Sequence, residues 1–576
     1  MNDLKEIVIK NFADAAVVDN YRVSADGTLT KRDGFRVLAS LGEYIRGYCY
    51  DGADVIYAVA GSCLYCVRNG QIYVIATLDG EAFGAKTERC IVYAYAGVVY
   101  MIGNGSFYSF DTTYPGAEVK SFEFIPVRES NREEYPVTAY NLISEKERTI
   151  SLATVNSKID RVLKSSPVCC VLLDDILLSE SQYSITESGG YYVVEITDDS
   201  LLTESRIFTI VHYTSADRFT NKKELCSRCK NAYVYEGKSG VRVFLYGGEE
   251  GCIYYSEAVT LHVDEETGET IDMPLGTIIG DFYPAGNEIY APGEGEMIRA
   301  ILPYNERTLV ITDRATYSLV EETKTTDDTV TFKRFRLVSI DNELGMGENS
   351  GVVSYDGKLY LISALGLYSL SYNPIEDKYS TKRLTIPDNV GVSRDDMDSV
   401  RLNVDRVNHE LWLQNGDKCA VYSFNEKKWY RFSGFCPTSF FTYQNASAFT
   451  EGNRICVFTV GEILDGGVGF EAYVETHNLD LGNIFSEKTI YSFGATFERR
   501  EGAALECTLK SDKGATFTFR MDADSSDADT SPVVKRTHAR LGGCYYVICR
   551  VGTPADAAPA NLRSILISYR VMGGNV

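Results

Sequence analysis

Long helices, membrane spans and secreted disulfide frameworks have little support in this sequence. Its 576 residues include only 14 Pro and two Trp, and no extended Ala/Glu/Lys/Leu heptads. No run approaches the ~18 apolar residues that span a bilayer, and the N-terminus lacks the apolar core of a signal peptide. The 15 Cys are scattered and odd in number, which predicts reduced thiols. We therefore expect synthesis in a cytoplasm without export, and no membrane-spanning segment.

Positive charge is also scarce. Lys and Arg total 57 against 80 Asp and Glu, which gives a net charge of −23. Duplex phosphates repel such a chain unless a local basic patch overrides the average. A DNA-binding protein that reads sequence is excluded on this ground. An acidic surface would instead suit a duct through which DNA slides without sticking.

Sequence motifs of catalysis are missing. The chain has no GxSxG, no P-loop and no GxGxxG that opens a helix, and its five His form no HExxH. The carboxylate pairs Asp174-Asp175 and Asp395-Asp396 would point opposite ways on a strand, unlike the acid/base couple of a glycosidase. We predict no catalytic residue, no cofactor-binding residue and no enzyme activity.

Two CxxC pairs, Cys63–Cys66 and Cys226–Cys229, could together supply four thiolates to zinc. Residues three apart on a strand face opposite ways, so the first pair is poorly placed to hold one ion. The second pair lies where a turn is possible, but it needs two more ligands. Reduced structural cysteines are the favoured interpretation, and we predict no metal-binding residue.

An acidic segment superficially resembles a calcium loop. Its polar residues are Asp522, Asp524, Ser526, Asp527 and Asp529. Calcium loops of the EF-hand type need a glycine at the sixth position and a glutamate at the twelfth, and here Val533 holds the twelfth. The segment therefore predicts an exposed hairpin tip.

Aromatic residues and glycines are abundant, with 40 Tyr, 26 Phe and 48 Gly. Such a composition favours pleated sheets and tight turns. The segment 356–372, DGKLYLISALGLYSLSY, begins with an Asp-Gly turn and continues as two alternating strands around a small-residue break. It predicts a β-hairpin with one buried face. The chain is therefore expected to be all-β.

Variants of this hairpin recur along the chain. Each places a tyrosine near the start of its second strand, namely Tyr65, Tyr108, Tyr254, Tyr317, Tyr368 and Tyr422. A period of about forty to sixty residues with four strands per unit is typical of β-propeller blades. Six hairpins are visible, and 454–460 could belong to a seventh, so we predict six or seven blades. The alternative is two unrelated β-sandwiches with similar hairpins.

The repeat is interrupted once and fades near the end. Residues 126–219 contain apolar strands punctuated by acidic and glycine turns, which predicts a small inserted β-domain. From 465 to 576 the strand spacing fits a β-sandwich. The propeller would then comprise residues 1–125 and 220–464. Its opening includes a hairpin at 16–38.

Aromatic residues at Trp429, Tyr430 and Phe432 could line a sugar-binding shelf. Because the chain has only two Trp, packing at a blade edge is the favoured interpretation.

The opening NYRVSADGTLTKRDGF resembles that of bacteriophage tail proteins of the nozzle and packaged-DNA-stabilisation type. The resemblance is carried by Asn20, Asp26, Gly27, Leu29, Arg32 and Gly34. Asp33 stands where such sequences often have proline. Three further parts of the chain are similar to that group: the hairpin GKLYLISALGLYSLSY, the segment VYSFNEKKWYRFSGF, and the C-terminal ETHNLDLGNIFSEKTI with its closing ILISYRVMGG.

The resemblance implies a structural virion protein of the phage tail, made in the host cytoplasm. Family members assemble as a ring, commonly sixfold, beneath portal and adaptor proteins. The ring continues the DNA channel, lets viral DNA pass without sequence preference, retains the genome until infection and offers docking sites to tail fibres. The alternative from another class is a carbohydrate-binding or glycan-cleaving propeller at a host surface. A third hypothesis is an intracellular protein-interaction propeller.

Overall fold

The computed structural model describes most of the chain. The described residues are 4–572 without 13–14, 79–87, 114–115, 130–138, 152–153, 156, 203–205, 238–239, 259–278, 327–329, 349, 483, 499–500 and 524–531. Strands dominate these residues, and α1 (Thr220–Ser227) is their single α-helix. No helix in this part of the chain is long and apolar enough to cross a membrane. The predicted all-β class is confirmed.

Seven antiparallel meanders of four strands follow one another along the described residues. In chain order they are β6 (Ile45–Tyr50), β7 (Val55–Ala60), β8 (Cys63–Arg68) and β9 (Gln71–Thr77); β10 (Ile91–Tyr95), β11 (Val98–Gly103), β12 (Ser106–Asp111) and β13 (Lys120–Ser121); β23 (Asn231–Gly237), β24 (Gly240–Tyr246), β25 (Cys252–Tyr255) and β26 (Glu288–Tyr290); β27 (Ile298–Tyr304), β28 (Arg307–Thr312), β29 (Thr316–Thr326) and β30 (Val330–Asp341); β31 (Val352–Tyr355), β32 (Lys358–Ser363), β33 (Gly366–Asn373) and β34 (Lys378–Leu384); β35 (Arg401–Asp405), β36 (Glu410–Asn415), β37 (Lys418–Ser423) and β38 (Lys428–Ser433); and β39 (Ser439–Tyr443), β40 (Ala446–Glu451) and β41 (Arg454–Phe458) with β5 (Phe35–Ser40).

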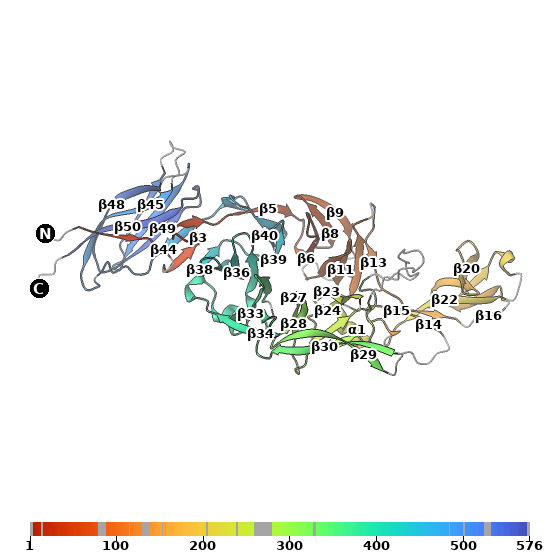
Figure 1. Cartoon of the computed structure of the whole chain (residues 1–576). Coiled ribbons are helices and arrows are strands. Elements are labelled where there is room, and N and C mark those ends of the chain that lie inside the picture. The colour runs from red at the N-terminus through yellow and green to blue at the C-terminus, as the bar shows by residue number, and fades with distance from the viewer. Residues whose placement is uncertain are drawn as a thin grey trace.

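The meanders pack in a closed ring, as in a β-propeller (Figure 1). Each meander shares a buried hydrophobic cluster with the next one along the chain. Ile455 of β41 and Ile56 of β7 belong to one further cluster, so the seventh meander packs on the first. The ring is sealed by hydrogen bonds between β41 and the N-terminal strand β5.

The repeating hairpins are the second and third strands of the meanders. All six repeat tyrosines lie on third strands, namely β8, β12, β25, β29, β33 and β37. In the hairpin at 356–372, Asp356 and Gly357 both have positive φ, of 48° and 67°, as a tight hairpin turn requires. Leu361 of β32 is fully buried. Tyr360 and Ile362, on the opposite face of β32, are buried as well. The prediction of one buried face is therefore wrong, because the fourth meander covers one face of this strand and the sixth covers the other.

A smaller unit of two sheets follows β13 (Figure 1). One sheet contains β14 (Val127–Glu129), β15 (Lys146–Ile150), β22 (Ile207–Ser215), β18 (Val168–Leu173) and β19 (Ile176–Leu177), with β16 (Thr154–Val155) beside β22. The other contains β17 (Ile159–Leu163), β21 (Tyr191–Ile196) and β20 (Tyr183–Ser188). In the described residues these strands pair only with one another. We call this unit the insertion.

One part of the predicted insertion belongs to the ring instead. Tyr140 and Leu142 are buried in the cluster between the second and third meanders. Leu142 N donates to the carbonyl of Tyr283, and Ala285 N donates to the carbonyl of Tyr140. The boundary 126–219 is therefore too wide as an independent unit, because these residues supply backbone pairing and apolar surface to the propeller.

The C-terminal strands form a second β-structure together with the N-terminus. One sheet holds β1 (Lys5–Ile9), β3 (Tyr21–Val23), β4 (Leu29–Lys31), β50 (Leu562–Val571), β45 (Lys488–Glu498) and β48 (Pro532–Cys544). The other continues from β38 through β2 (Val17–Asp19), β44 (Ala472–Glu475), β49 (Val547–Thr553), β46 (Ala504–Ser511) and β47 (Thr516–Asp522). We call these two sheets the sandwich.

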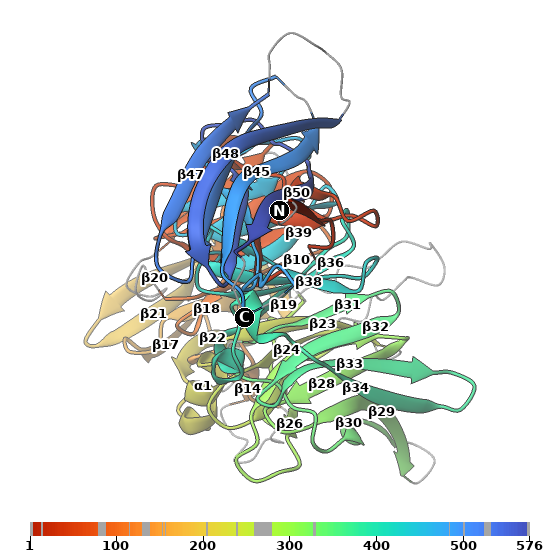
Figure 2. The same ribbon diagram turned by 90° about the vertical axis from the view of Figure 1, so that its left-hand side faces the viewer.

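The prediction that residues 1–125 all belong to the propeller is therefore wrong for the first 31 residues. β1 pairs with β50 over five residue pairs, since both strands offer alternating aliphatic side chains to the same core. The predicted hairpin at 16–38 exists as β3 and β4, but it lies in the sandwich. Figure 2 shows the N-terminus beside β50.

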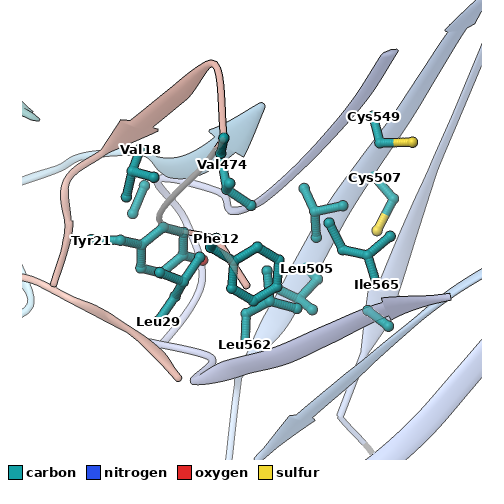
Figure 3. Packing of buried hydrophobic residues seen from close by; sticks show 14 of the residues in the cluster. Phe12, Val18, Tyr21, Leu29, Val474, Leu505, Cys507, Cys549, Leu562 and Ile565 are labelled. Atoms are coloured by element: carbon teal, nitrogen blue, oxygen red, sulfur yellow. The ribbon is translucent and has the colours of Figure 1, made fainter. Parts of the chain in front are cut away.

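The sandwich core brings N-terminal and C-terminal side chains together (Figure 3). Phe12, Tyr21 and Leu29 are fully buried against Leu505 and Leu562. Complete burial of each such side chain contributes about 1.5–3 kcal/mol. The Tyr21 hydroxyl lies 2.9 Å from Thr553 Oγ1, so its polar end is also satisfied.

Candidate functional site

Arg32 lies at the centre of the contact between sandwich and ring, which we call the joint. Its side chain is buried, and its two Nη atoms donate to Asp465 Oδ1 and Oδ2 at 2.9 and 2.5 Å. Arg32 Nε donates to Asn20 Oδ1 at 2.8 Å, and the guanidinium lies 4.0 Å from the Phe470 ring centroid. Such a bidentate, stacked arrangement fits arginine and not lysine.

Asn20 connects three parts of the chain at the joint. Its φ of 56° lies in the left-handed region that asparagine tolerates. Its Nδ2 donates to the carbonyl of Glu471 at 2.8 Å, and its Oδ1 accepts from Ser433 N at 2.9 Å. Gly34 completes the arrangement, since an added Cβ would lie 2.0 Å from the carbonyl oxygen of Leu464. Asn20, Arg32 and Gly34, which belong to the opening segment NYRVSADGTLTKRDGF, therefore hold the N-terminus, β38 and the sandwich together.

A second buried charge lies nearby. Glu410 accepts from Arg22 Nε at 2.8 Å and from Trp412 Nε1 at 2.9 Å, and it also accepts from the Tyr430 hydroxyl. Burial, together with the Glu410 charge, raises the pKa of Tyr430 well above its ordinary value. The buried carboxylates of Asp465 and Glu410 are thus paired with arginine side chains and further donors, which fixes the geometry of the joint.

Lys31 is the least compensated cation of the joint. Its side chain is 5% exposed, and its ammonium has no hydrogen-bond partner among the described residues. The ammonium lies 4.2 Å from the Phe470 ring centroid. Burial and then the positive charge of Arg32 lower the pKa of Lys31 to about 8.

A cavity of about 320 Å³ opens where the insertion meets the ring. Its lining residues are Ser109, Lys120, Ser121, Phe122, Glu123, Phe124, Ile125, Arg148, Tyr213 and Asp281. Aromatic faces and charged groups thus share one concave surface. That mixture can hold a polar ligand that also has an apolar face, such as a sugar ring.

The cavity wall is held by a few polar contacts. Arg148 Nε and Nη2 donate to the Ile125 carbonyl at 3.0 and 2.8 Å. Asn141 Nδ2 donates to the carbonyls of Phe124 and Asp281 at 2.7 and 2.8 Å. A hydrogen bond with Cys169, together with burial, raises the pKa of Tyr213 to about 12, so its hydroxyl stays protonated at neutral pH.

The cysteine pairs lie where the sequence predicted packing. Cys63 and Cys66 are half-buried on β8. Cys226 lies in the last turn of α1 and, with Cys229, is buried in the cluster between the second and third meanders. Burial raises the pKa of Cys229 to about 12 and also raises the pKa of Cys226 well above its ordinary value, which disfavours the thiolates that zinc needs. Among the described residues no group of three or more His, Cys, Asp or Glu could hold a metal ion.

The acidic pairs differ from their predicted setting. Asp174 and Asp175 both have positive φ in the turn between β18 and β19, and Asp395-Asp396 lies in the 3-10 helix η4 (Arg394–Ser399). Neither pair is on a strand, because local turn geometry outweighs alternation at these positions. Asp522 ends β47, and the rest of the acidic loop at 524–531 lies outside the described residues.

The proposed aromatic shelf is largely internal. Tyr430 and Phe432 are 3% and 0% exposed, and Trp429 packs on Tyr422 with ring centroids 5.1 Å apart. The described histidines lie far apart: His212 on β22, His409 before β36, His477 after β44 and His538 on β48. His262 lies outside the described residues.

Sequence reasoning missed both the joint and the cavity. Arg32 and Asp465 are far apart in the chain, and the cavity lining comes from five separate segments. The one available signal for the joint was Arg32, two residues before Gly34 in the opening segment.

No family model and no curated protein match the chain. Among solved structures, the WD40 domain of SCAP from fission yeast is 9% identical, with 79% of this chain and 98% of that one covered and a TM-score of 0.29. A glycoside hydrolase family 43 arabinoxylan arabinofuranohydrolase from Bacillus subtilis is 11% identical, with coverages of 84% and 95% and a TM-score of 0.20. An exo-beta-1,3-galactanase from Phanerochaete chrysosporium is 9% identical, with coverages of 97% and 100% and a TM-score of 0.17.

The prediction that the chain is not an enzyme is corrected by these similarities. The galactanase and the arabinofuranohydrolase are enzymes, and missing sequence motifs do not by themselves exclude an enzyme. TM-scores this low assign no activity to the chain either. The propeller-like arrangement rests on the sheet topology itself.

Proposed function

We propose that the chain is a structural component of a bacteriophage tail, of the nozzle or packaged-DNA-stabilisation type. In this proposal the seven meanders are the blades of one propeller, and several copies form a ring that continues the DNA channel and retains the packaged genome. Portal or adaptor proteins and tail fibres would be its partners. The solved structures that resemble the chain are not named as tail proteins and lend this proposal no support.

One observation carries the proposal. Of the segments that resemble the tail family, those at 20–35, 421–435, 475–490 and 565–571 all contribute buried residues to one core. These residues include Tyr21, Leu29, Phe432, Leu481, Ile490, Ile565 and Ile567. Turn motifs that were similar by chance would have no reason to meet in space. Their convergence supports a shared architecture.

The arrangement of the parts suits a ring subunit. The sandwich and the insertion extend from opposite sides of the propeller (Figure 1). Each is therefore free to contact a neighbouring copy or a fibre while the propeller forms the wall. A net charge of −23 would keep DNA from sticking to that wall.

Electron microscopy tests the proposal directly. Particles of the phage that encodes this chain, labelled with antibody against it, should carry the label on the tail axis as a closed ring, commonly sixfold. A chain that is missing from the virion would overturn the proposal, whatever its state in solution.

A carbohydrate-binding propeller is the second candidate, and the cavity beside the insertion is the observation that favours it. The exposed lining residue Glu123 offers a matched test against Glu118, which is also exposed on the same segment but outside the cavity. A glycan array should register binding that Glu123→Gln removes and Glu118→Gln leaves unchanged. A polysaccharide hydrolysis assay would show whether binding leads to cleavage. Silence in both assays would dispose of this candidate.

A further inference from the structure

Cys169 and Cys170 are the only adjacent cysteines in the sequence. Both lie on β18 of the insertion, and both are half-buried, whereas most of the other cysteines are buried. Two neighbouring thiols that solvent reaches differ chemically from buried single thiols, because they can react with each other through a shared partner.

A β-bulge turns both thiols to the same face of the sheet. The register with β22 shifts between Val168 and Cys170, so Cys169 is the extra residue of the bulge. Cys170 pairs with Val211 and therefore faces the same way as Tyr213, two residues further along β22. The Cys169 thiol donates to the Tyr213 hydroxyl at 3.3 Å, so it lies on that face as well. On a regular strand the two thiols would point to opposite faces.

The two thiols also interact with each other. Burial, then the charge of Cys169 and a hydrogen bond with it, raise the pKa of Cys170 to about 11. The guanidinium of Arg148, which lies opposite Tyr213 on the neighbouring strand β15, acts in the other direction. Cys170 is therefore a protonated thiol at neutral pH, and the first attack on a disulfide falls to Cys169.

The peptide between the cysteines is held less firmly than the rest of β18. In the described residues β19 pairs with β18 only opposite Leu172 and Leu173, and Cys169 has no partner residue on β22. The backbone thus has room to twist at this point. Adjacent Cα atoms lie about 3.8 Å apart, below the about 4.4–6.8 Å of ordinary disulfides, so a bond between these two cysteines is strained. Strained disulfides are the easily reduced ones.

We propose that Cys169 and Cys170 are a modification site, a dithiol that low-molecular-weight disulfides such as oxidised glutathione convert reversibly to a disulfide. The Cys169 thiolate attacks one sulfur of oxidised glutathione, and one glutathione leaves and takes up the proton. The Cys170 sulfur then attacks Cys169 in the mixed disulfide, and the second glutathione leaves with the second proton. The protein loses two electrons and two protons, and one glutathione disulfide becomes two thiols. This site is independent of the proposed function.

Oxidation changes one wall of the cavity beside the insertion. Tyr213 and Arg148 both line that cavity. A disulfide leaves Cys169 without a hydrogen to donate, so the Tyr213 hydroxyl loses a partner that it has in the reduced protein. The redox state of the dithiol thereby determines how this wall presents the hydroxyl to a bound molecule.

Mass spectrometry of the full chain tests the site. After incubation with oxidised glutathione and alkylation of the remaining thiols, the peptide that contains both cysteines should carry no alkyl group and should be two hydrogens lighter than the reduced peptide. Reduced glutathione should reverse the change. Cys63→Ser/Cys66→Ser is the control, since it removes a half-buried pair that lies three residues apart on β8, and it should leave the result unchanged.

Two single variants separate the steps of the reaction. Cys170→Ser should stop at one glutathione bound to Cys169. Cys169→Ser should take up glutathione at least tenfold more slowly, because Cys170 is protonated at neutral pH. Two alkylated cysteines in the treated wild type, or a disulfide from either of them to another residue, would overturn the site. Equal rates in the two single variants would overturn the order of attack.

Hydrogen exchange of the wild-type chain needs no variant and tests the effect on the cavity. The β22 amides around Tyr213 should exchange faster in the oxidised chain than in the reduced one, while those of the seven meanders should not change. Unchanged exchange along β22 in a fully oxidised chain would overturn the effect on the cavity wall.

Discussion

The buried ion pair between Arg32 and Asp465 is the strongest single link between the ring and the sandwich. Both groups are nearly without solvent contact, and the remaining donors of Arg32 are used by Asn20 and by backbone carbonyls. Removal of one partner leaves the other as an uncompensated buried charge. Replacement of both by apolar groups does not.

We expect Arg32→Met to lower the free energy of unfolding by about 3–5 kcal/mol, because Asp465 then stays buried without its cation. Arg32→Met/Asp465→Leu should recover most of that loss. Urea denaturation followed by tryptophan fluorescence measures both. Lys164→Met, which breaks the exposed pair with Glu187, is the matched control and should cost less than about 1 kcal/mol. A double variant as unstable as the single one would show that packing of Arg32, and not its charge, holds the joint.

Lys31 should make stability depend on alkaline pH. Its folded pKa is about 8, whereas an unfolded lysine titrates near 10.4. Between these values the unfolded state binds more protons, so the free energy of unfolding rises with pH, and the cost of burying the charge is complete below pH 8. Lys31→Met should therefore be more stable than the wild type by about 1–2 kcal/mol at pH 7, since each pKa unit is worth 1.36 kcal/mol and the contact with Phe470 is lost.

Urea denaturation at pH 7, 8, 9 and 10 checks this. The advantage of Lys31→Met should shrink steadily toward pH 10. A difference that stays constant from pH 7 to 10 would contradict the assigned titration.

The sequence singled out the opening segment 20–35 by its resemblance to a family, but it did not show that these residues hold the ring and the sandwich together. Turn residues such as Asp26 and Gly27 follow from local chemistry, and both lie in the β3–β4 turn. The partner of Arg32 could not be predicted, because a charged residue carries no sign of which opposite charge, hundreds of positions away, it will meet.

At the scale of elements, the residues at which the insertion begins and ends decide how much of it can be removed without damage to the ring. Its strands β15 and β22 run side by side where they leave the ring, with Lys146 opposite Ser215 and Ala216 N donating to the Glu145 carbonyl at 2.9 Å. The part of the insertion from β15 to β22 therefore leaves and rejoins the ring at one place, whereas β14 reaches the same sheet separately. The segment around Tyr140 precedes this point and packs in the ring.

We expect a short deletion to be tolerated and a long one to be damaging. Replacement of 147–214 by Asn-Gly closes a hairpin between Lys146 and Ser215 and should leave the melting temperature within a few degrees. Deletion of 126–219 also removes Tyr140 and Leu142, and loss of a large buried side chain costs about 2–5 kcal/mol each. Thermal denaturation followed by circular dichroism compares the two. Equal destabilisation would mean that the ring needs the insertion itself.

Elements with long alternating patterns were predicted well, and short ones were not. The hairpins of β32 and β33 and their relatives repeat one recognisable strand pattern, which predicted their strands although both faces of β32 are buried. β2, β3 and β4 have three residues each, too few to show which sheet they join. The N-terminus was thus assigned to the propeller on hairpin signals that fit the sandwich equally well.

For the whole molecule, stability depends on every contact between neighbouring meanders. Leu361 is fully buried in the cluster shared by the fourth and fifth meanders. Leu361→Asp places an unpaired charge there, which the protein avoids only by unfolding or by opening the ring. We expect loss of the cooperative thermal transition and of assembly together. Lys358→Asp, on an exposed position of the same strand, is the control and should melt within a few degrees of the wild type. A folded, assembling Leu361→Asp would show that the cluster between the fourth and fifth meanders is not a tightly packed core.

The seal between β5 and β41 has a consequence for biosynthesis. About 410 residues separate Ser40 from Arg454, and the ribosome adds roughly 5–20 residues per second. Each nascent chain therefore waits roughly 20 to 80 s with β5 already outside the ribosome and its partner not yet made. During that time the growing propeller is an open arc. Nascent chains on neighbouring ribosomes of the same messenger RNA then expose unpaired β5 strands, which β41 covers in the finished ring. The yield of folded protein should therefore depend on the spacing between those ribosomes.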